Sequence, residues 1–324
     1  MIDERGRKID YIRISLTDRC NLRCRYCMPS GGVEALAHDK IIRFEELLRL
    51  CGIFSQLGIN KFKISGGEPL VRKGACGFIG ELKSLPGVEQ VTLTTNGQLL
   101  DKYLPELRQA QVDGINISMD TLNAEKYRYI TRGGCLDTAL AAIDNAYRAG
   151  FCPVKINCVA MKGFNDDEFA ELARISRDRK ISLRFIEIMP IGLGSCFAGI
   201  SSDNILDTLT DIYGKPKQLR DKLGNGPARY YLFPDFASPI GIIDAVSHGF
   251  CLECNRVRLT ADGHLKLCLN FDLGCDLLTP MRHGWGDEDL KKLIYDTVRK
   301  KPESHSFGKE KEHTEIKNMN QIGG

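Results

Sequence analysis

The stretch CNLRCRYCMP, residues 20–29, places three cysteines within eight positions, at Cys20, Cys24 and Cys27. A loop with the spacing CxxxCxxC can bring three thiolates to three irons of a cubic 4Fe-4S cluster. No fourth cysteine lies in the loop, so one iron of such a cluster would stay open to a substrate or a cofactor. The alternatives are loop cysteines without a metal and a zinc site, although structural zinc sites usually have four protein ligands.

The composition is that of a folded protein outside the secretory route. Of 324 residues, 43% are hydrophobic and 27% are charged, which excludes a disordered chain and allows one large core plus a smaller one. The amino terminus does not resemble a signal peptide, and no stretch approaches the ~20 apolar residues of a membrane helix. The net charge of +3 is too small to indicate binding to nucleic acid or to a membrane. We expect a cytoplasmic protein whose thirteen cysteines are not paired as disulfides.

The cysteine loop, with Tyr26 before its last cysteine, resembles the signature of the radical S-adenosylmethionine (SAM) enzymes. The resemblance implies that Cys20, Cys24 and Cys27 hold a 4Fe-4S cluster and that SAM binds its open iron. It also implies that one electron cleaves SAM to a 5'-deoxyadenosyl radical, which the protein directs onto a substrate. The superfamily shares a partial parallel barrel of strand and helix repeats.

Hydrophobic periodicity in the first half of the chain predicts such a fold. Strands are expected at residues 11–16, 61–65, 91–95, 115–119, 154–160 and 183–188. Helical patterns lie between them, as in residues 43–57 and 136–150. This alternation favours the α/β class, and we expect a partial TIM-type parallel barrel of about six β/α repeats over residues 1–190.

The expected strands carry polar residues on one face and apolar residues on the other. The polar sets are Lys61, Lys63 and Ser65; Thr92, Thr94 and Asn96; Asn116 and Ser118; and Lys155 and Asn157. If the apolar faces pack against helices, the interior is polar and open, with three lysines pointing into it, and it suits an anion. An antiparallel sheet with one wet face is the alternative, but it fits the intervening helices poorly.

Residues that suit a ligand site follow the expected strands, as sites of parallel folds do. In GGEP, residues 66–69, the glycines allow close backbone approach and the glutamate can accept from an ammonium group; a tight turn without a ligand would also explain the glycines. By resemblance, the residues that contact SAM are Tyr26, Gly66, Gly67, Glu68, Pro69, Thr94, Asn96, Ser118 and Met189. Arg184 and Met189 have opposite parity along one strand, so the chain must bend between them.

A second cysteine set lies in the remainder of the chain. Glycine-rich loops and short strands follow residue 190, so we expect a smaller C-terminal α+β domain over residues 191–324. It contains Cys251, Cys254 and Cys268 within CLECNRVRLTADGHLKLCL, residues 251–269. Beside the first set, these cysteines predict a second 4Fe-4S cluster with its own open iron, while zinc with His248 or Cys275 as fourth ligand is the alternative.

The second segment also predicts a hairpin. A three-residue loop at residues 261–263 would pair Thr260 with His264, Arg258 with Lys266 and Arg256 with Cys268. This register places a cluster ligand beside a basic stripe, which a polyphosphate could neutralise. The remaining cysteines are predicted to be small buried hydrophobic residues: Cys51, Cys76, Cys135, Cys152, Cys158, Cys196 and Cys275.

The pattern CxxCNRVRLTADG, the segment RISLTDRCN (residues 13–21) and the terminal Gly323 and Gly324 narrow the resemblance. They resemble the branch of the superfamily that acts on GTP in molybdenum-cofactor (molybdopterin) biosynthesis. The resemblance implies that ribose carbon 3' of GTP is joined to carbon 8 of guanine, giving 3',8-cyclo-7,8-dihydro-GTP. This is the first step of the pathway, and a cyclic pyranopterin monophosphate synthase uses the product.

The same resemblance implies a site for GTP between the two clusters, with guanine at the open iron of the second. The residues implied to bind the triphosphate are Arg13, Lys61, Lys63, Lys155, Arg184, Arg256 and Arg258. Single lysines are more often solvated surface residues, which is the alternative for each. Gly323 and Gly324 are implied to reach the active site and to take part in catalysis.

An external electron donor completes this scheme, which also allows a homodimer. Two other functions stay open. A peptide-modifying radical SAM enzyme similar to sulfatase maturases would usually carry more auxiliary cysteines. A non-enzymatic iron–sulfur or zinc redox regulator would explain the cysteines but not GGEP or the polar barrel interior.

Overall fold

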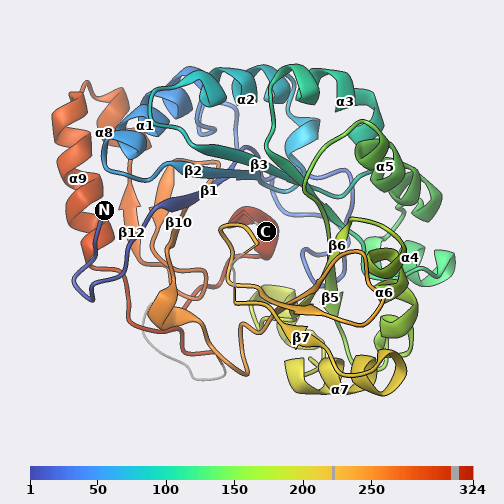
Figure 1. Ribbon diagram of the computed structural model, residues 1–324. Helices are drawn as coiled ribbons and strands as arrows, with labels where there is room; N and C mark the ends of the chain where they lie inside the picture. The colour runs from blue at the N-terminus through green and yellow to red at the C-terminus, as the bar shows by residue number, and fades with distance from the viewer. Residues whose placement is uncertain (221–222, 308–313, 324) are drawn as a thin grey trace.

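The computed structural model describes residues 1–220, 223–307 and 314–323. Six parallel strands form the centre of one curved sheet (Figure 1). They are β1 (Tyr11–Ser15), β2 (Lys61–Ser65), β3 (Gln90–Thr95), β4 (Gly114–Ser118), β5 (Val154–Ala160) and β6 (Ser182–Glu187). Each bound lies within one residue of its prediction. Neighbours from β1 to β6 pair in parallel, which excludes the antiparallel alternative.

The later strands extend the same sheet at both ends. They are β7 (Lys217–Gln218), β8 (Arg229–Leu232), β9 (Ile240–Ile243), β10 (Arg256–Leu259), β11 (His264–Lys266) and β12 (Gly274–Asp276). Strand β10 pairs in parallel with β1, and β9 pairs in parallel with β6. The sheet order β12-β11-β10-β1-β2-β3-β4-β5-β6-β9-β8-β7 does not close on itself. The predicted partial barrel is therefore confirmed, and the second half of the chain adds strands to it, while the domain division at residue 190 stays a prediction.

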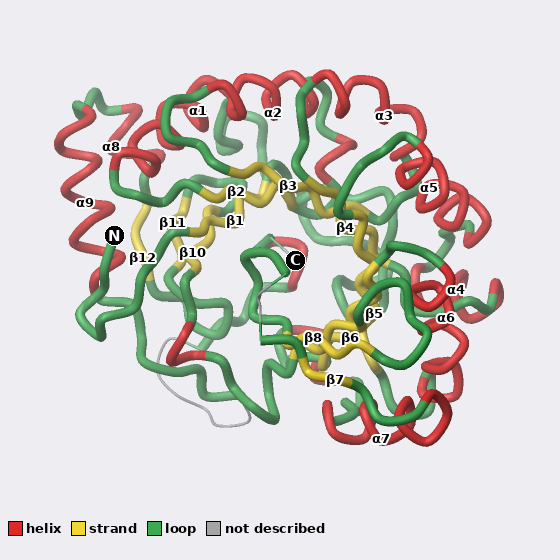
Figure 2. Tube along the Cα trace, viewed as in Figure 1, coloured by secondary structure: helices red, strands yellow, loops and turns green. Residues whose placement is uncertain are grey.

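Helices cover the outer, convex face of the sheet, and the carboxyl-terminal end of the chain lies inside its curve (Figure 2). The α-helices are α1 (Phe44–Gln56), α2 (Ala75–Ser84), α3 (Leu100–Gln109), α4 (Ala124–Thr131), α5 (Leu136–Arg148), α6 (Phe169–Asp178), α7 (Ser202–Tyr213), α8 (Leu278–Arg282) and α9 (Asp287–Arg299). Short 3-10 helices are η1 (Pro69–Val71), η2 (Asp166–Glu168), η3 (Gly192–Cys196), η4 (Cys251–Glu253) and η5 (Met319–Gln321). No helix among the described residues is both long and apolar enough to cross a membrane.

The strand alternation sorts side chains between the two faces of the sheet. Ile12 and Ile14 of β1 lie beside Phe62 and Ile64 of β2, and all four are buried in the core between sheet and helices. Their polar neighbours in sequence occupy the other, concave face. The apolar packing thus forces polar residues toward the inside of the curve, where the cavities described below lie.

The predicted hairpin register is confirmed where the ladder is formed. Arg258 pairs with Lys266, and the Thr260 amide donates to the His264 carbonyl at 3.0 Å. Strand β11 ends at Lys266, so the expected pairing of Arg256 with Cys268 lies beyond the ladder.

Candidate active site

The first cysteine loop follows β1 and opens into a cavity on the concave face. Cys20, Cys24 and Cys27 line this cavity together. Burial raises the pKa of the Cys24 thiol well above its usual value, and the nearby Cys27 and Cys20 raise it further. Three thiols close enough to influence one another, and reluctant to ionise unaided, fit a metal centre, because coordination to a metal deprotonates a thiol. The loop is held in place by Arg132, whose guanidinium donates to the Met28 carbonyl at 2.9 Å.

The glycines of GGEP bring two backbone segments together. A Cβ atom on Gly66, whose φ is +148°, would lie 2.5 Å from the Thr17 carbonyl oxygen, and one on Gly67 would overlap the Arg19 carbonyl oxygen. The Gly67 amide donates to Thr17 at 2.7 Å and the Glu68 amide donates to Arg19 at 2.9 Å. The sequence predicted that these glycines let the backbone approach a ligand closely. In the structure they also let the GGEP backbone approach the segment that leads into the cysteine loop.

Glu68 is fully buried beneath this turn. Its carboxylate accepts from the amides of Leu70 at 3.1 Å and Asn96 at 2.7 Å, and from the Thr95 hydroxyl at 2.9 Å. Burial raises the pKa of Glu68 to about 7, although these hydrogen bonds act in the opposite direction. The carboxylate therefore fixes the end of β3, and its acceptance of a SAM ammonium stays a prediction.

The other residues predicted to contact SAM surround the same cavity. Tyr26, Thr94, Asn96, Ser118 and Met189 all line it, while Pro69 begins η1 beneath it. Strand β6 ends at Glu187, so the chain leaves the strand before Met189, as the parity argument required. The Asn96 side chain donates to the Asn21 side chain at 2.9 Å and lies 3.7 Å from the Cys20 sulfur.

Asp120 is a member of this site to which the sequence reasoning gave no role. Its carboxylate accepts from the Tyr26 hydroxyl at 2.8 Å and from the Val159 amide at 2.9 Å. Burial raises the pKa of Asp120 to about 6, against these two hydrogen bonds. Its position two residues after Ser118, just beyond β4, was the available signal.

A second cavity on the concave face is lined by basic residues and by no Asp or Glu among the described part of the chain. Its cations are Arg13, Lys63, Lys155, Arg184 and Arg256. We call this cavity the basic chamber. Arg13 lines both this chamber and the cavity of the first cysteine loop, whereas Arg258 lines only the cysteine-loop cavity of the two. The two cavities are therefore neighbours.

The cations of the basic chamber repel one another. Burial lowers the pKa of Lys63 well below its usual value, and the charges of Arg184 and Arg13 lower it further. Burial likewise lowers the pKa of Arg13 to about 10, with Arg256 and Arg184 acting in the same direction. Uncompensated positive charge of this kind indicates a site for an anion.

Polar contacts hold the chamber walls in position. Arg184 donates to the Asn116 side chain at 2.7 Å, a contact that the sequence did not assign. The Lys155 ammonium donates to the Tyr230 hydroxyl at 3.1 Å and to the Leu223 carbonyl. The Arg13 guanidinium donates to the Ser65 hydroxyl at 2.9 Å.

Lys61 does not share the chamber with Lys63. It begins β2, does not line the chamber, and forms an ion pair with Asp10 at 2.8 Å. It lines an adjoining cavity, which contains Cys254 and shares Arg256 with the chamber. Of the three lysines predicted to point into the interior, the structure places Lys63 and Lys155 there.

The second cysteine set lies beside the chamber. Cys251 begins η4, Cys254 follows it, and Cys268 comes after β11. Burial raises the pKa of Cys251, and the neighbouring Cys268 and Cys254 add to this shift. Burial also acts to raise the pKa of Cys254, yet Lys301 and Arg256 lower it to about 7. Three adjacent thiols near positive charge suit an anionic thiolate-bound cluster.

Of the two candidates for a fourth zinc ligand, His248 lines the same cavity as Cys254, but its ring contacts other side chains. His248 contacts the Ser202 hydroxyl at 3.2 Å and lies 3.6 Å from Asp244. Cys275 belongs to β12, paired with Leu265. Across the described part of the chain, no three His, Cys, Asp or Glu side chains are arranged to hold a single metal ion.

Lys266 is neutralised inside the protein. It is fully buried and pairs with Glu315, and it lies 3.3 Å from Asp272. The predicted basic stripe of the hairpin therefore reduces to Arg256 and Arg258, because a distant carboxylate takes up the third charge.

The end of the chain reaches the site. The Gly323 carbonyl accepts from Arg258 at 3.3 Å and from the Ser65 hydroxyl at 3.2 Å. A Cβ atom on Gly323, whose φ is +85°, would lie 3.2 Å from the Ser15 Cβ atom. Gly324 lies outside the described residues, so the catalytic part of this prediction stays a prediction.

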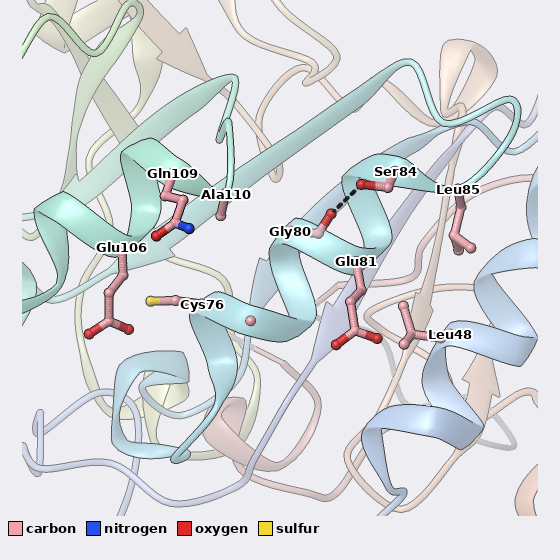
Figure 3. A pocket seen from close by; sticks show the side chains of 10 residues that line it. Leu48, Cys76, Gly80, Glu81, Ser84, Leu85, Glu106, Gln109 and Ala110 are labelled. Atoms are coloured by element: carbon pink, nitrogen blue, oxygen red, sulfur yellow. Dashed lines mark hydrogen bonds between the residues drawn. The ribbon is translucent and has the colours of Figure 1, made fainter.

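The remaining cysteines are not all buried. Cys51, Cys76 and Cys158 are buried as predicted, and Cys275 is half-buried. The prediction is wrong for Cys135, Cys152 and Cys196, which are exposed because they lie outside the packed faces of helices and strands. Cys76 lines a groove on the outer side of α2 with Glu81 of that helix and Glu106 of α3 (Figure 3). This groove shares no lining residue with the cavities of the concave face.

Two family models match consecutive parts of the chain. The Radical SAM superfamily model matches residues 14–175, and the Molybdenum Cofactor Synthesis C model matches residues 181–307. Curated relatives match nearly the whole length. A GTP 3',8-cyclase of Peptoclostridium acidaminophilum is 44% identical over 95% of this chain and 94% of its own. One from Heliobacterium modesticaldum is 43% identical over 100% of both chains.

Solved structures share the fold at low sequence identity. The crystal structure of Streptococcus suis SuiB bound to S-adenosylmethionine matches with a TM-score of 0.66 at 14% identity. The match covers 90% of this chain and 68% of that chain. It shows a common architecture.

Proposed function

The chain belongs to the GTP 3',8-cyclase family of radical SAM enzymes, and from this premise we propose where its substrate and cofactors bind. As a member it acts on GTP in the first step of molybdenum-cofactor biosynthesis and uses SAM with 4Fe-4S clusters. We propose that Cys20, Cys24 and Cys27 hold the SAM-binding cluster. Cys251, Cys254 and Cys268 hold the second.

The observation that carries the proposed GTP site is the basic chamber, whose described lining includes five cations and no carboxylate. Buried positive charges without counter-charges are costly, and a bound polyphosphate relieves that cost. Arg and Lys form charge-assisted hydrogen bonds to phosphate oxygens. We therefore place the triphosphate among Arg13, Lys63, Lys155, Arg184 and Arg256, with Arg258 at the edge nearer the first cluster.

The position of the chamber supports a substrate between two clusters. Arg13 lines both the chamber and the cavity of the first cysteine loop. Arg256 lines both the chamber and the cavity that contains Cys254. A nucleotide held by its triphosphate can extend its ribose toward the first set and its guanine toward the second.

The first cysteine set would hold the cluster that, together with SAM, would supply a 5'-deoxyadenosyl radical able to take a hydrogen atom from ribose carbon 3'. The chain holds the nucleotide rigidly, which keeps the reacting carbons within reach. The Tyr26 ring is fixed by its hydroxyl contact with Asp120, and Gly323 contacts Ser65 and Arg258, which line the cavity of the first cysteine loop.

The same proposal includes partners that act before and after this step. An external reductant supplies the electron, and a cyclic pyranopterin monophosphate synthase takes the product. A cytoplasmic location belongs to the proposal on the sequence arguments alone, and the scheme is compatible with a homodimer.

Anaerobic reconstitution followed by turnover tests this function. The reconstituted protein should contain about eight irons, as expected for two 4Fe-4S clusters. With GTP, SAM and dithionite it should release 5'-deoxyadenosine and a cyclised nucleotide, and ATP in place of GTP should give no cyclised product. Formation of 5'-deoxyadenosine at the same rate with and without GTP, and without any cyclised nucleotide, would contradict GTP as the substrate.

A further inference from the structure

A strap formed by residues 301–305 lies against the second cysteine set. It follows α9, and the Lys301 amide donates to the Val298 carbonyl at 3.2 Å. The Lys301 ammonium donates to the carbonyl of Leu267, the residue before Cys268. The His305 amide donates to the Cys251 sulfur at 3.4 Å. The strap therefore contacts the cysteine segment at both ends.

Arg7, near the amino terminus, also fixes this strap. The Arg7 guanidinium donates to the carbonyls of Lys301 at 3.0 Å, Pro302 at 2.9 Å and Glu303 at 3.1 Å. It also donates to the Cys251 carbonyl at 2.9 Å and pairs with Asp3 at 2.7 Å. Such a saturated guanidinium holds the strap and the cysteine segment in one arrangement.

Lys301 and Lys266 are two buried lysines near Cys268, and they differ in whether a carboxylate neutralises their charge. Lys301 is 2% exposed and Lys266 is 0% exposed. Lys266 pairs with Glu315 and Asp272. Within the described residues, Lys301 forms no ion pair with a carboxylate, and its ammonium bonds only to a carbonyl. A buried ammonium without a counter-charge is costly, so Lys301 needs another anion.

The anions within reach are the thiolates of the second set. The Lys301 ammonium is held at the Leu267 carbonyl, one residue before Cys268, and the strap that carries it also donates the His305 amide to the Cys251 sulfur. A thiolate-bound 4Fe-4S cluster is negatively charged, and its reduction adds one more negative charge. A fixed cation beside it stabilises the reduced form more than the oxidised form.

We propose that Lys301 is the built-in counter-charge of the second cluster, a positioning residue that raises the cluster's reduction potential and helps to retain it. This inference rests on the proposed second 4Fe-4S cluster but not on GTP turnover. Arg7 and the backbone of the strap hold the ammonium in place. Lys266 plays no such part, because Glu315 already neutralises it.

The test compares Lys301→Gln with Lys301→Arg in the reconstituted holoenzyme without GTP. Glutamine keeps a donor for the Leu267 carbonyl but removes the charge, while arginine keeps the charge. Both clusters are titrated with dithionite and followed by electron paramagnetic resonance, and the signal that changes on adding SAM is assigned to the first cluster. At the wild-type midpoint, Lys301→Gln should lower the ratio of reduced to oxidised second cluster about tenfold. This corresponds to ~59 mV for a one-electron couple.

Two internal references accompany the titration. The first cluster should keep its midpoint in every variant. The double variant Lys266→Met/Glu315→Gln removes a buried pair without changing the net charge, and it should leave the midpoint of the second cluster in place. Lys301→Arg should restore most of the wild-type value.

The outcomes separate a charge effect from a purely structural one. An unchanged second midpoint in Lys301→Gln, or an equal shift in the double variant, overturns the proposal. If Lys301→Gln and Lys301→Met both lose about four irons, retention by Lys301→Arg supports the counter-charge role, and equal loss in Lys301→Arg overturns it. A shifted midpoint in a protein that does not cyclise GTP would contradict the proposed function and leave this inference intact.

Discussion

Lys63 and Lys61 provide a matched pair for testing the basic chamber. They lie two residues apart on β2, share one face of the strand, and carry the same charge. Lys63 lines the chamber, whereas Lys61 pairs with Asp10 at 2.8 Å outside it. Substitution of each by methionine removes one charge and keeps a similar length. The two variants should therefore differ only through the place of the side chain in the fold.

The expected difference in GTP affinity is large. A hydrogen bond to a charged group contributes ~1.5–3 kcal/mol, and each 1.4 kcal/mol is a factor of ten. Lys63→Met should thus weaken GTP binding by about 10- to 150-fold. Lys61→Met removes a partly exposed ion pair worth ~0.2–1 kcal/mol of stability, and Asp10 keeps its contact with Asn255 at 2.8 Å. Its effect on GTP affinity should stay within about threefold.

Isothermal titration of GTP into the oxidised holoenzyme measures this without turnover. Inorganic triphosphate should compete with GTP in the wild type and should lose affinity in Lys63→Met by a similar factor. Without ligand, Lys63→Met should melt at a higher temperature than the wild type, because Arg184 and Arg13 no longer repel a third cation. Equal weakening of GTP binding in both variants, or a normal affinity in Lys63→Met, would refute the placement of the triphosphate.

Three further outcomes follow from the site. The pKa of Lys63 is lower in the folded protein than in the unfolded chain, so between these two values the unfolded chain binds more protons. The free energy of unfolding should therefore rise with pH in that window. Urea titrations from neutral pH toward pH ~10 should show this rise, and an equal rise in Lys63→Met would contradict it. Gly67→Ala should destabilise the fold by ~1–3 kcal/mol or more and lower iron loading at the first set, because its Cβ overlaps the Arg19 carbonyl oxygen; full iron content with an unchanged melting temperature would argue against this packing. Tyr26→Phe should cost ~1–3 kcal/mol by removing a donor from buried Asp120, and Asp120→Asn in the same chain should recover part of that loss; strictly additive effects in denaturant unfolding would exclude the coupling.

Much of the fold was accessible from local patterns. The alternation of polar and apolar residues located the six central strands, since burial of one sheet face requires a period of two. Turn chemistry at residues 261–263 fixed the hairpin register, because loop length determines which residues face each other. The three exposed cysteines were predicted incorrectly, because residue type alone does not say whether a loop position is covered.

The candidate site was accessible in part. The two cysteine sets could be proposed as cluster ligands because the members of each set lie close in sequence. Asp120 was given no role because its partner, the Tyr26 hydroxyl, is 94 residues away. The lining of the chamber comes from segments in both halves of the chain. Arg13 and Arg256, for example, line the same cavity although they are far apart in sequence.

The sequence by itself determined which residue types occur on which face of each strand, and it predicted which cysteines share a cluster. Only the tertiary structure decided which charges remain uncompensated. Lys61 is paired with Asp10, 51 residues away, and Lys266 with Glu315, 49 residues away, whereas Lys63 and Lys301 have no carboxylate partner among the described residues. Strand parity sets the direction of a side chain, but the partner that neutralises a charge comes from a distant segment that folding brings to it.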